Sequence, residues 1–343
     1  MNHRAKKARS ATSRDVAALA GVSLMTVSRT LRTPDLVSPA TRLKVEAAAR
    51  ELKYVPDLAA GALSSQRSGH VAVLLPSLRH SGFLRTVDGL SDTLRANGYH
   101  LLIGDCYYSP DEQTELLRLM LGRRPEAIVL VSSMDSPEAR ELLDQSGIPI
   151  VETWDWPATP ADMVVGFSQF EAGSALTQSL IDDGYTRIGF LGGPAHSDPY
   201  GEQRRKGHAA ALQKASLRED IHVTVSDTPM EIQDGVTGVT VLRKTFPETQ
   251  ALVCATDMTA LGALTECQRR GWSVPDELAI AGYGNFDFAP HLTPTLTSVK
   301  LPSYRMGKQA AELIVSQMET GVRPAQATRN LGFEIINRQS TQR

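Results

Sequence analysis

The feature that most constrains this chain is the stretch from Ser13 to Leu31, which divides into two short helical segments at a glycine. Gly21 interrupts the apolar spacing of the first segment, and Ser23 offers an N-cap for a second helix, Leu24 to Leu31. A corner this tight needs a residue that tolerates positive φ, as glycine does at little cost. The stretch therefore predicts a helix-turn-helix, whose second helix presents side chains to base edges in the major groove of DNA.

Helical periodicity separates an inner from an outer face in this region. Ser38 and Pro39 start a third predicted helix, Ala40 to Leu52, which would close a three-helix core. The outer face of the second helix presents Leu24, Met25, Ser28 and Arg29. The residues expected to point inward are Val16, Ala17, Leu19 and Ala20, then Val22, Val27 and Leu31, then Leu43, Val45, Ala47, Ala48 and Leu52.

Charge is distributed unevenly along the 343 residues. Residues 1–67 hold 12 Lys and Arg against 5 Asp and Glu, a net charge of +7, and the remaining 24 basic and 33 acidic residues give −9. Because residues 1–67 are positively charged and the rest of the chain is negatively charged, only residues 1–67 should attract phosphate groups. This division supports a DNA contact made by the N-terminal part alone.

The start of the chain carries no targeting or membrane signal. No apolar run follows MNHRAKKARS, so we expect a cytoplasmic protein whose basic residues through about Ala11 are disordered without DNA. The three cysteines, Cys106, Cys254 and Cys267, have no metal-like spacing. We therefore expect reduced buried thiols, no metal site and no cofactor.

Two segments, DVAALAGVSLMTVSRTL and KYVPDLAAGALSSQRSGHVAVLLPS, occur at residues 15–31 and 53–77. Together they resemble the LacI/GalR family of bacterial repressors, and within it the gluconate-type repressors. The resemblance implies a homodimer on a quasi-palindromic operator of double-stranded DNA. It also implies DNA contacts from Thr12, Ser23, Leu24, Met25, Thr26, Ser28, Arg29 and Tyr54.

Residues 56–69 are predicted to form a hinge and linker. The run Leu58 to Leu63 is too short to be a stable helix alone, so we expect it to fold on binding DNA. The resemblance implies that two such helices pair in the minor groove, with Leu63 wedged between base pairs and Ala60 close to the groove. Gly61, where many relatives carry a basic residue, weakens this helix by roughly 1 kcal/mol relative to Ala.

From His70 onward, short apolar strands alternate with helices, a pattern typical of parallel sheets covered on both faces. The predicted fold class is α/β, with two doubly wound lobes that resemble periplasmic sugar-binding proteins. The expected divisions are a tail at 1–11, a helix-turn-helix domain at 12–55, the hinge at 56–69 and an effector-binding and dimerisation core at 70–343. Within that core the first lobe covers about 70–165 and 297–326, and the second about 166–296 and 327–343.

Ligands of such folds bind at the carboxyl ends of the parallel strands, between the lobes. The resemblance implies that Arg204, at an R-x-x-G helix start ending with Gly207, clamps the effector. For the aromatic candidates, Trp154 and Phe167, core packing is the alternative role. The candidates that follow strands are Ser77, Phe83, Glu152, Trp154, Phe167, Thr256 and Asn285.

The run from Gly282 to Asp287, GYGNFD, departs from the family pattern Gly-Phe/Tyr-Asp-Asp, whose first Asp holds sugar hydroxyls. A carboxylate about 4 Å from an anionic ligand would repel it by about 1–4 kcal/mol, so its absence favours an acidic effector such as gluconate or a ketogluconate. Arg204 would then bind the effector carboxylate. The hydroxyls of the effector would be bound by Ser77, Glu152 and Asn285.

Other function classes fit less well. No GxxxxGK[ST] or GxGxxG run and no Ser/His/Asp set is visible, so we expect no enzyme. A sugar-binding protein without a regulatory role would have no use for a helix-turn-helix. Among regulators, a neutral sugar effector, a corepressor-dependent repressor and an activator stay open. No heptad run follows Phe333, which favours a dimer over a tetramer.

Overall fold

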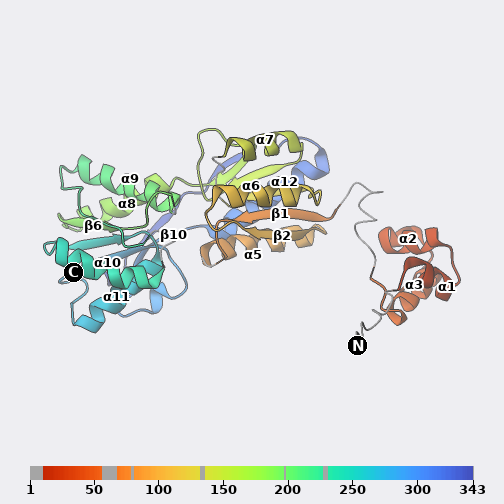
Figure 1. Ribbon diagram of the computed structural model, residues 1–343, viewed down its shortest axis with the longest axis horizontal. Coiled ribbons are helices and arrows are strands. Elements are labelled where there is room, and N and C mark those ends of the chain that lie inside the picture. Colours follow the sequence, from red (N-terminus) through yellow and green to blue (C-terminus); the bar gives the residue numbers. More distant parts are fainter. Residues whose placement is uncertain are drawn as a thin grey trace, which may run out of the picture. The chain divides into compact units, whose positions relative to one another are not determined.

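The computed structural model describes residues 11–55, 68–78, 81–131, 136–196, 198–226 and 231–342. The chain divides into two compact units, residues 1–68 and 69–343 (Figure 1). The predicted hinge contacts Ala60 and Leu63 lie outside the described residues. Across those residues, no helix combines the length and apolar character needed to span a bilayer.

The N-terminal unit is the predicted helix-turn-helix followed by a third helix. Gly21 ends the first helix with φ at 65°, the left-handed conformation that the tight corner requires. Ser23 and Ser38 cap the next two helices, each accepting a hydrogen bond from the backbone N–H three residues on. The helices are α1 (Ser13–Ala20), α2 (Leu24–Arg32) and α3 (Pro39–Glu51), with a 3₁₀ turn at Pro34–Leu36.

The core of this unit is smaller than predicted. Beside Val27 the inward position belongs to Thr30, whose hydroxyl donates to the carbonyl oxygen of Thr26 at 2.8 Å. Because this bond satisfies the hydroxyl, a polar side chain can be buried there, and Leu31 lies 37% exposed at the margin. The buried core side chains are Val16, Ala17, Val27, Val45 and Ala48. The prediction was wrong for Leu19, Leu31, Leu43 and Ala47, which are exposed.

The C-terminal unit contains two six-stranded sheets, one in each lobe. In the first lobe the order is β11-β5-β4-β3-β1-β2, and every pairing is parallel. Its strands are β1 (His70–Leu75), β2 (His100–Asp105), β3 (Ala127–Leu130), β4 (Ile150–Thr153), β5 (Met163–Gly166) and β11 (Thr328–Asn330). Its helices are α5 (Ser81–Ala96), α6 (Pro110–Leu121), α7 (Pro137–Ser146) and α12 (Ser303–Thr320).

Strand β1 shows why this sheet needs cover on both faces. Val71, Val73 and Leu75 point into a core with side chains of α5 and α12. Ala72 and Leu74 point into another core with side chains of α6 and α7. Because successive residues of a strand face opposite sides, an uninterrupted apolar run is stable only between two helical layers. The doubly wound architecture predicted from the sequence is confirmed.

The second lobe repeats this arrangement with one difference. Its sheet order is β12-β10-β9-β8-β6-β7, and the edge strand β12 runs antiparallel to β10. The strands are β6 (Ile188–Leu191), β7 (His222–Val223), β8 (Ala251–Cys254), β9 (Ala279–Gly284), β10 (Thr297–Lys300) and β12 (Glu334–Ile336). The helices are α8 (Gln169–Asp182), α9 (Pro199–Lys214), α10 (Ile232–Thr245) and α11 (Asp257–Arg270), and a 3₁₀ turn lies at Ala289–His291.

The crossings between the lobes lie a few residues later than predicted. Strand β10 at 297–300 pairs with β9 and therefore belongs to the second lobe, not the first. Its Ser298 hydroxyl donates to Oδ1 of buried Asp257 at 2.6 Å, which ties the strand to the start of α11. Strand β11 at 328–330 pairs with β5 and belongs to the first lobe. The chain therefore crosses after Lys300 and returns after Asn330.

Candidate DNA-binding and effector sites

The outer face of α2 carries four of the predicted DNA contacts. Leu24, Met25, Ser28 and Arg29 are all exposed. Arg29 makes no ion pair with any of the described residues, so its guanidinium is available to a base or a phosphate. The structure thus gives one continuous solvent-facing surface of the type that a recognition helix needs.

The other predicted contacts in this unit have structural tasks of their own. Thr12 and Asp15 form a reciprocal capping box at the start of α1. Ser23 and Thr26 bond through their hydroxyl oxygens at 2.9 Å at the start of α2. Tyr54 is half-buried against the core of the unit. Thr12, Ser23 and Thr26 lie at helix N-termini, which favour phosphate oxygens, whereas Tyr54 follows the end of α3. The DNA contacts of all four residues stay predictions.

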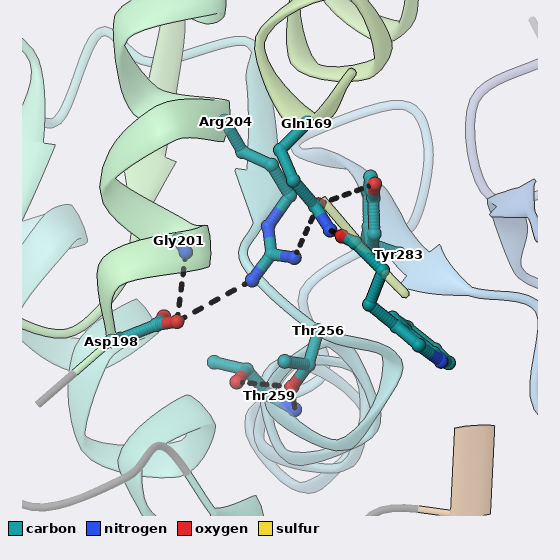
Figure 2. A network of polar contacts seen from close by, with 8 residues as sticks. Gln169, Asp198, Gly201, Arg204, Thr256, Thr259 and Tyr283 are labelled. Atoms are coloured by element: carbon teal, nitrogen blue, oxygen red, sulfur yellow. Dashed lines mark hydrogen bonds and ion pairs between the residues drawn. The ribbon is translucent and has the colours of Figure 1, made fainter. Parts of the chain in front are cut away.

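Arg204 lies in the first turns of α9 with only 6% of its surface exposed. Its Nη1 donates to Oε1 of Gln169 at 3.0 Å, and its Nη2 lies 3.5 Å from Oδ1 of Asp198 (Figure 2). The guanidinium also stacks over the ring of Tyr283, 4.3 Å from the centroid. One buried cation is thus held by an amide, a carboxylate and an aromatic face.

The R-x-x-G pattern has a packing reason. A Cβ on Gly207 would lie 2.0 Å from the carbonyl oxygen of Phe170, and one on Gly173 would lie 2.2 Å from that of Arg204. The two glycines therefore let α8 and α9 approach each other with backbone against backbone. This close approach brings Arg204 of α9 within hydrogen-bonding distance of Gln169 at the start of α8.

Gln169 connects this network to the first lobe. Its Oε1 also accepts the hydroxyl of Tyr283 at 2.7 Å, and its Nε2 donates to the carbonyl oxygen of Trp154 at 2.8 Å. Burial raises the pKa of Tyr283 well above its ordinary value, so the phenol stays protonated and donates. Trp154 follows β4 with φ at 68°, an unusual conformation for a large side chain.

Two buried polar atoms in this network have no hydrogen-bonding partner among the described residues: Nε of Arg204 and Oδ2 of Asp198. A buried donor or acceptor left unpaired costs about 1–3 kcal/mol, and native folds contain few of them. Here a donor and an acceptor stand unpaired on two side chains that contact each other. The network therefore has one donor and one acceptor to offer to a further polar group.

The aromatic candidates pack against one another. The rings of Phe83 and Trp154 meet edge-on with centroids 4.7 Å apart, and Phe167 lies 6.2 Å from Trp154 on centroids. The indole N–H of Trp154 donates to Oγ1 of Thr86 at 2.8 Å. All three rings are buried, as core packing requires, and the effector contacts predicted for Phe83, Trp154 and Phe167 stay predictions. Trp154 joins the Arg204 network through its backbone instead.

The remaining candidates are spread over several places. Thr256 caps α11 and bonds to Thr259 (Figure 2), and Ser77 is buried after β1. Glu152 is buried, accepts the backbone N–H of Ala161 at 2.7 Å and lines a cavity of about 440 Å³ that Gln169 also lines. These placements leave their effector contacts as predictions.

Asn285 contacts the C-terminal segment, and its effector contact stays a prediction. Its Oδ1 accepts from Nη2 of Arg338 at 2.7 Å, and its backbone N–H donates to Ser298 at 2.9 Å. It lines a second cavity, of about 510 Å³, with residues of α5 and the start of α12. Arg338 comes from the C-terminal segment, 53 residues after Asn285. The local sequence around Asn285 therefore does not reveal this contact.

Three residues of the network were not among the predicted site residues: Gln169, Asp198 and Tyr283. Asp198 followed by Pro199 is a helix-start pair six residues before Arg204, and this local signal could have found it. Gln169 follows the cap residue Ser168, but its partners lie 35 and 114 residues away. No local pattern identifies such contacts.

Comparison with known proteins identifies the family. Residues 12–57 match the bacterial regulatory proteins of the lacI family, and residues 177–341 match a periplasmic binding protein-like domain. The HTH-type transcriptional regulator GntR of Escherichia coli (strain K12) is 34% identical over 321 residues, which cover 94% of this chain and 96% of GntR. The chain belongs to the lacI family.

Solved structures agree with this assignment. A lacI-family transcriptional regulator from Silicibacter pomeroyi superposes with a TM-score of 0.90 at 32% identity, covering 97% of this chain and all of that one. The regulator GntR from Chromobacterium violaceum superposes with a TM-score of 0.75 at 34% identity, covering 79% and 99%. The lacI-family member described here is therefore a DNA-binding transcriptional regulator, and its relatives are regulators rather than enzymes.

Proposed function

We propose that this regulator is a repressor, active as a homodimer on a quasi-palindromic operator and released by a gluconate-like sugar acid. The main support for an acidic effector is the buried guanidinium of Arg204. Its hydrogen-bonding partner, Gln169, is neutral, and Asp198 stands at 3.5 Å, longer than a charge-assisted hydrogen bond. A carboxylate that reached hydrogen-bonding distance would satisfy this cation better than the present partners do.

The loop after β9 supports the same conclusion. Gly284 stands where the family pattern has its sugar-binding Asp, the amide of the next residue, Asn285, is held by Arg338, and Asp287 is exposed. Asp257, at the start of α11, accepts from Ser298 and from the backbone N–H of Phe286, so both its oxygens are occupied. Hydrogen bonds to neutral groups leave the charge of Asp257 in place, so the support comes from Gly284 and Asn285, which put uncharged residues where the family pattern has two acids.

In this proposal, the effector acts by changing the relative orientation of the two lobes. Gln169 forms hydrogen bonds to Trp154 of the first lobe and to Arg204 of the second. An effector bound to Arg204 would therefore affect the contact between the two lobes. A ligand shifts an equilibrium only through its differential affinity for the two states. The acid therefore binds the DNA-free form more tightly, and operator DNA weakens acid binding by the same factor.

The homodimer follows from the operator. A quasi-palindromic site needs two helix-turn-helix units related by a two-fold axis, which one chain does not supply. We expect the C-terminal unit, a compact fold that begins at Gly69, to provide the interface. Sedimentation of a fragment from Gly69 should show a dimer at micromolar concentration, and a monomer would contradict this part of the proposal.

Calorimetry with gluconate, 2-ketogluconate, glucose and ribose tests the effector. The acids should bind in preference to the neutral sugars, and Arg204→Ala should abolish the preference. Arg205→Ala is the matched control, because Arg205 pairs with Glu202 on the same helix and takes no part in the network. Preference for neutral sugars, or undiminished acid affinity in Arg204→Ala, would refute the acidic effector. Tighter acid binding with operator present would show corepression instead.

A further inference from the structure

We propose that Asp198 makes the effector site selective for a 2-hydroxy acid, a molecule that carries a hydroxyl on the carbon next to its carboxylate. The inference rests on the proposed function, since it assumes that an acid binds at Arg204. It goes further by assigning a role to Asp198 and by distinguishing gluconate, which has a 2-hydroxyl, from 2-deoxygluconate and from the open-chain form of 2-ketogluconate, which have none.

Asp198 is held rigidly with one oxygen unused. The residue is 8% exposed and is the N-cap of α9, where its Oδ1 accepts the backbone N–H of Gly201 at 2.8 Å (Figure 2). A Cβ on Gly201 would lie 1.9 Å from Oδ2, so the absent side chain of Gly201 makes room for the carboxylate. Oδ2 is buried and accepts no hydrogen bond from the described residues.

Arg204 has an unused donor that complements the unused acceptor of Asp198. Its Nη1 is occupied by Gln169, and its Nη2 faces Asp198 at 3.5 Å, while Nε is buried without an acceptor among the described residues. A guanidinium offers its N–H groups as a planar fork that suits a carboxylate. The two residues together therefore lack one acceptor for a cation and one donor for an anion.

A 2-hydroxy acid supplies both missing groups from adjacent atoms. Its carboxylate accepts from the guanidinium of Arg204, and its hydroxyl donates to Oδ2 of Asp198. An acid with a ketone at the same carbon has no proton to donate and places a second oxygen against the Asp198 carboxylate. A neutral sugar can donate a hydroxyl but leaves Arg204 without an anion. Only the hydroxy acid leaves neither side chain unpaired.

The test compares ligand selectivity in the wild type and in Asp198→Asn, with the full-length protein. Asparagine is as good an N-cap as aspartate, so the amide oxygen still accepts the Gly201 N–H and α9 keeps its start. Calorimetry gives the ratio of dissociation constants for gluconate, 2-deoxygluconate and 2-ketogluconate. We expect the wild type to prefer gluconate at least tenfold over 2-deoxygluconate, because a site built to bond a hydroxyl leaves its own polar group unpaired when the hydroxyl is missing.

In Asp198→Asn the ratio should fall to about threefold or less, mainly because the analogues bind better once the negative charge is removed. Asp183→Asn makes the same charge change at an exposed residue of the same lobe and should keep the wild-type ratio. Equal affinities of gluconate and 2-deoxygluconate in the wild type, or an unchanged ratio in Asp198→Asn, would overturn the inference while leaving an acidic effector intact. Failure of all three acids to bind the wild type would refute the proposed function itself.

Discussion

The backbone carbonyl of Trp154 accepts a hydrogen bond from the side-chain amide of Gln169 at 2.8 Å, and this single bond links the first lobe to the buried arginine of the second. Gln169 uses both ends of its amide, because its oxygen receives Arg204 and Tyr283. The side chain of Trp154 is fixed by Thr86 of α5, and its backbone N–H lies 3.3 Å from the sulfur of Met306 of α12. Arg204 is thereby connected, through Gln169 and Trp154, to two helices of the first lobe.

Removing the amide of Gln169 should weaken effector binding and uncouple it from DNA. Gln169→Ala leaves Arg204 without its hydrogen-bonding acceptor, so we expect about a tenfold loss of gluconate affinity, equivalent to about 1–2 kcal/mol. Calorimetry with and without operator measures both effects. Gln178→Ala on the same helix is the control, because its amide bonds only Asp182 in an exposed pair. Equal affinities in the two variants would rule out the connecting role.

Replacing Arg29 should reduce sequence discrimination on DNA. The exposed guanidinium on α2 is placed for base contact, so Arg29→Ala should cost about 1–3 kcal/mol of preference for the operator over random DNA. Electrophoretic mobility shifts with both DNAs, at fixed salt, measure the ratio. Arg50→Ala removes an exposed arginine from α3 and should lower affinity for both DNAs about equally. An unchanged ratio in Arg29→Ala would show that α2 does not read bases through this residue.

The α8 and α9 contact should not tolerate a methyl group. Gly207→Ala places its Cβ 2.0 Å from the carbonyl oxygen of Phe170, and relieving that overlap should cost about 1–3 kcal/mol of unfolding free energy and move Arg204 from Gln169. Urea denaturation reports the first effect and gluconate affinity the second. Gly122→Ala is the control, because Gly122 follows α6 with ordinary helical backbone and only contacts at 3.4 Å or more. A stable Gly207→Ala with normal affinity would contradict the packing argument.

His208 should make the protein sensitive to mild acid. The hydroxyl of Thr177 donates to the carbonyl oxygen of Gly173, so Nδ1 of His208 donates to Thr177 and the buried Nε2 keeps a lone pair without a partner in the described chain. Burial, with help from His222 and Arg205, lowers the pKa of His208 to about 3. Protonation therefore favours the unfolded chain, in which the ordinary histidine pKa applies.

The stability contributed by neutral His208 is full above about pH 6.5 and is lost as the pH falls toward 3. Between pH 7 and pH 5 this loss should reach about 2 kcal/mol. Urea midpoints measured at both values, for the wild type and for His208→Gln, give the difference. The glutamine variant keeps a donor for Thr177 but has no titrating group, so its midpoint should change less. Identical pH dependence in the two proteins would exclude His208 as the source.

Local sequence determined the features whose interactions span a few residues. Gly21 and the caps Ser23 and Ser38 act on backbone groups at most four residues away, so the three helices of the N-terminal unit followed from the pattern alone. The alternation of apolar strands with helices likewise predicted two doubly wound lobes. A parallel strand that is covered on both faces is apolar along its whole length, and this pattern is visible in the sequence. Family resemblance added Arg204, which the structure places in the centre of a buried polar network.

Tertiary structure alone decided which side chains meet. Gln169 and Arg204 come together because two glycines let α8 and α9 pack with their backbones in contact. Tyr283 reaches Gln169 from β9, and the amide of Asn285 accepts from Arg338, 53 residues further along the chain. Such contacts depend on how whole helices and strands are spaced, since a hydrogen bond is lost when its partners separate by little more than half an ångström. Residue type and periodicity specify which face of an element is buried. They do not specify the distance between two buried faces, and that distance decides that Gln169 of α8 meets Arg204 of α9.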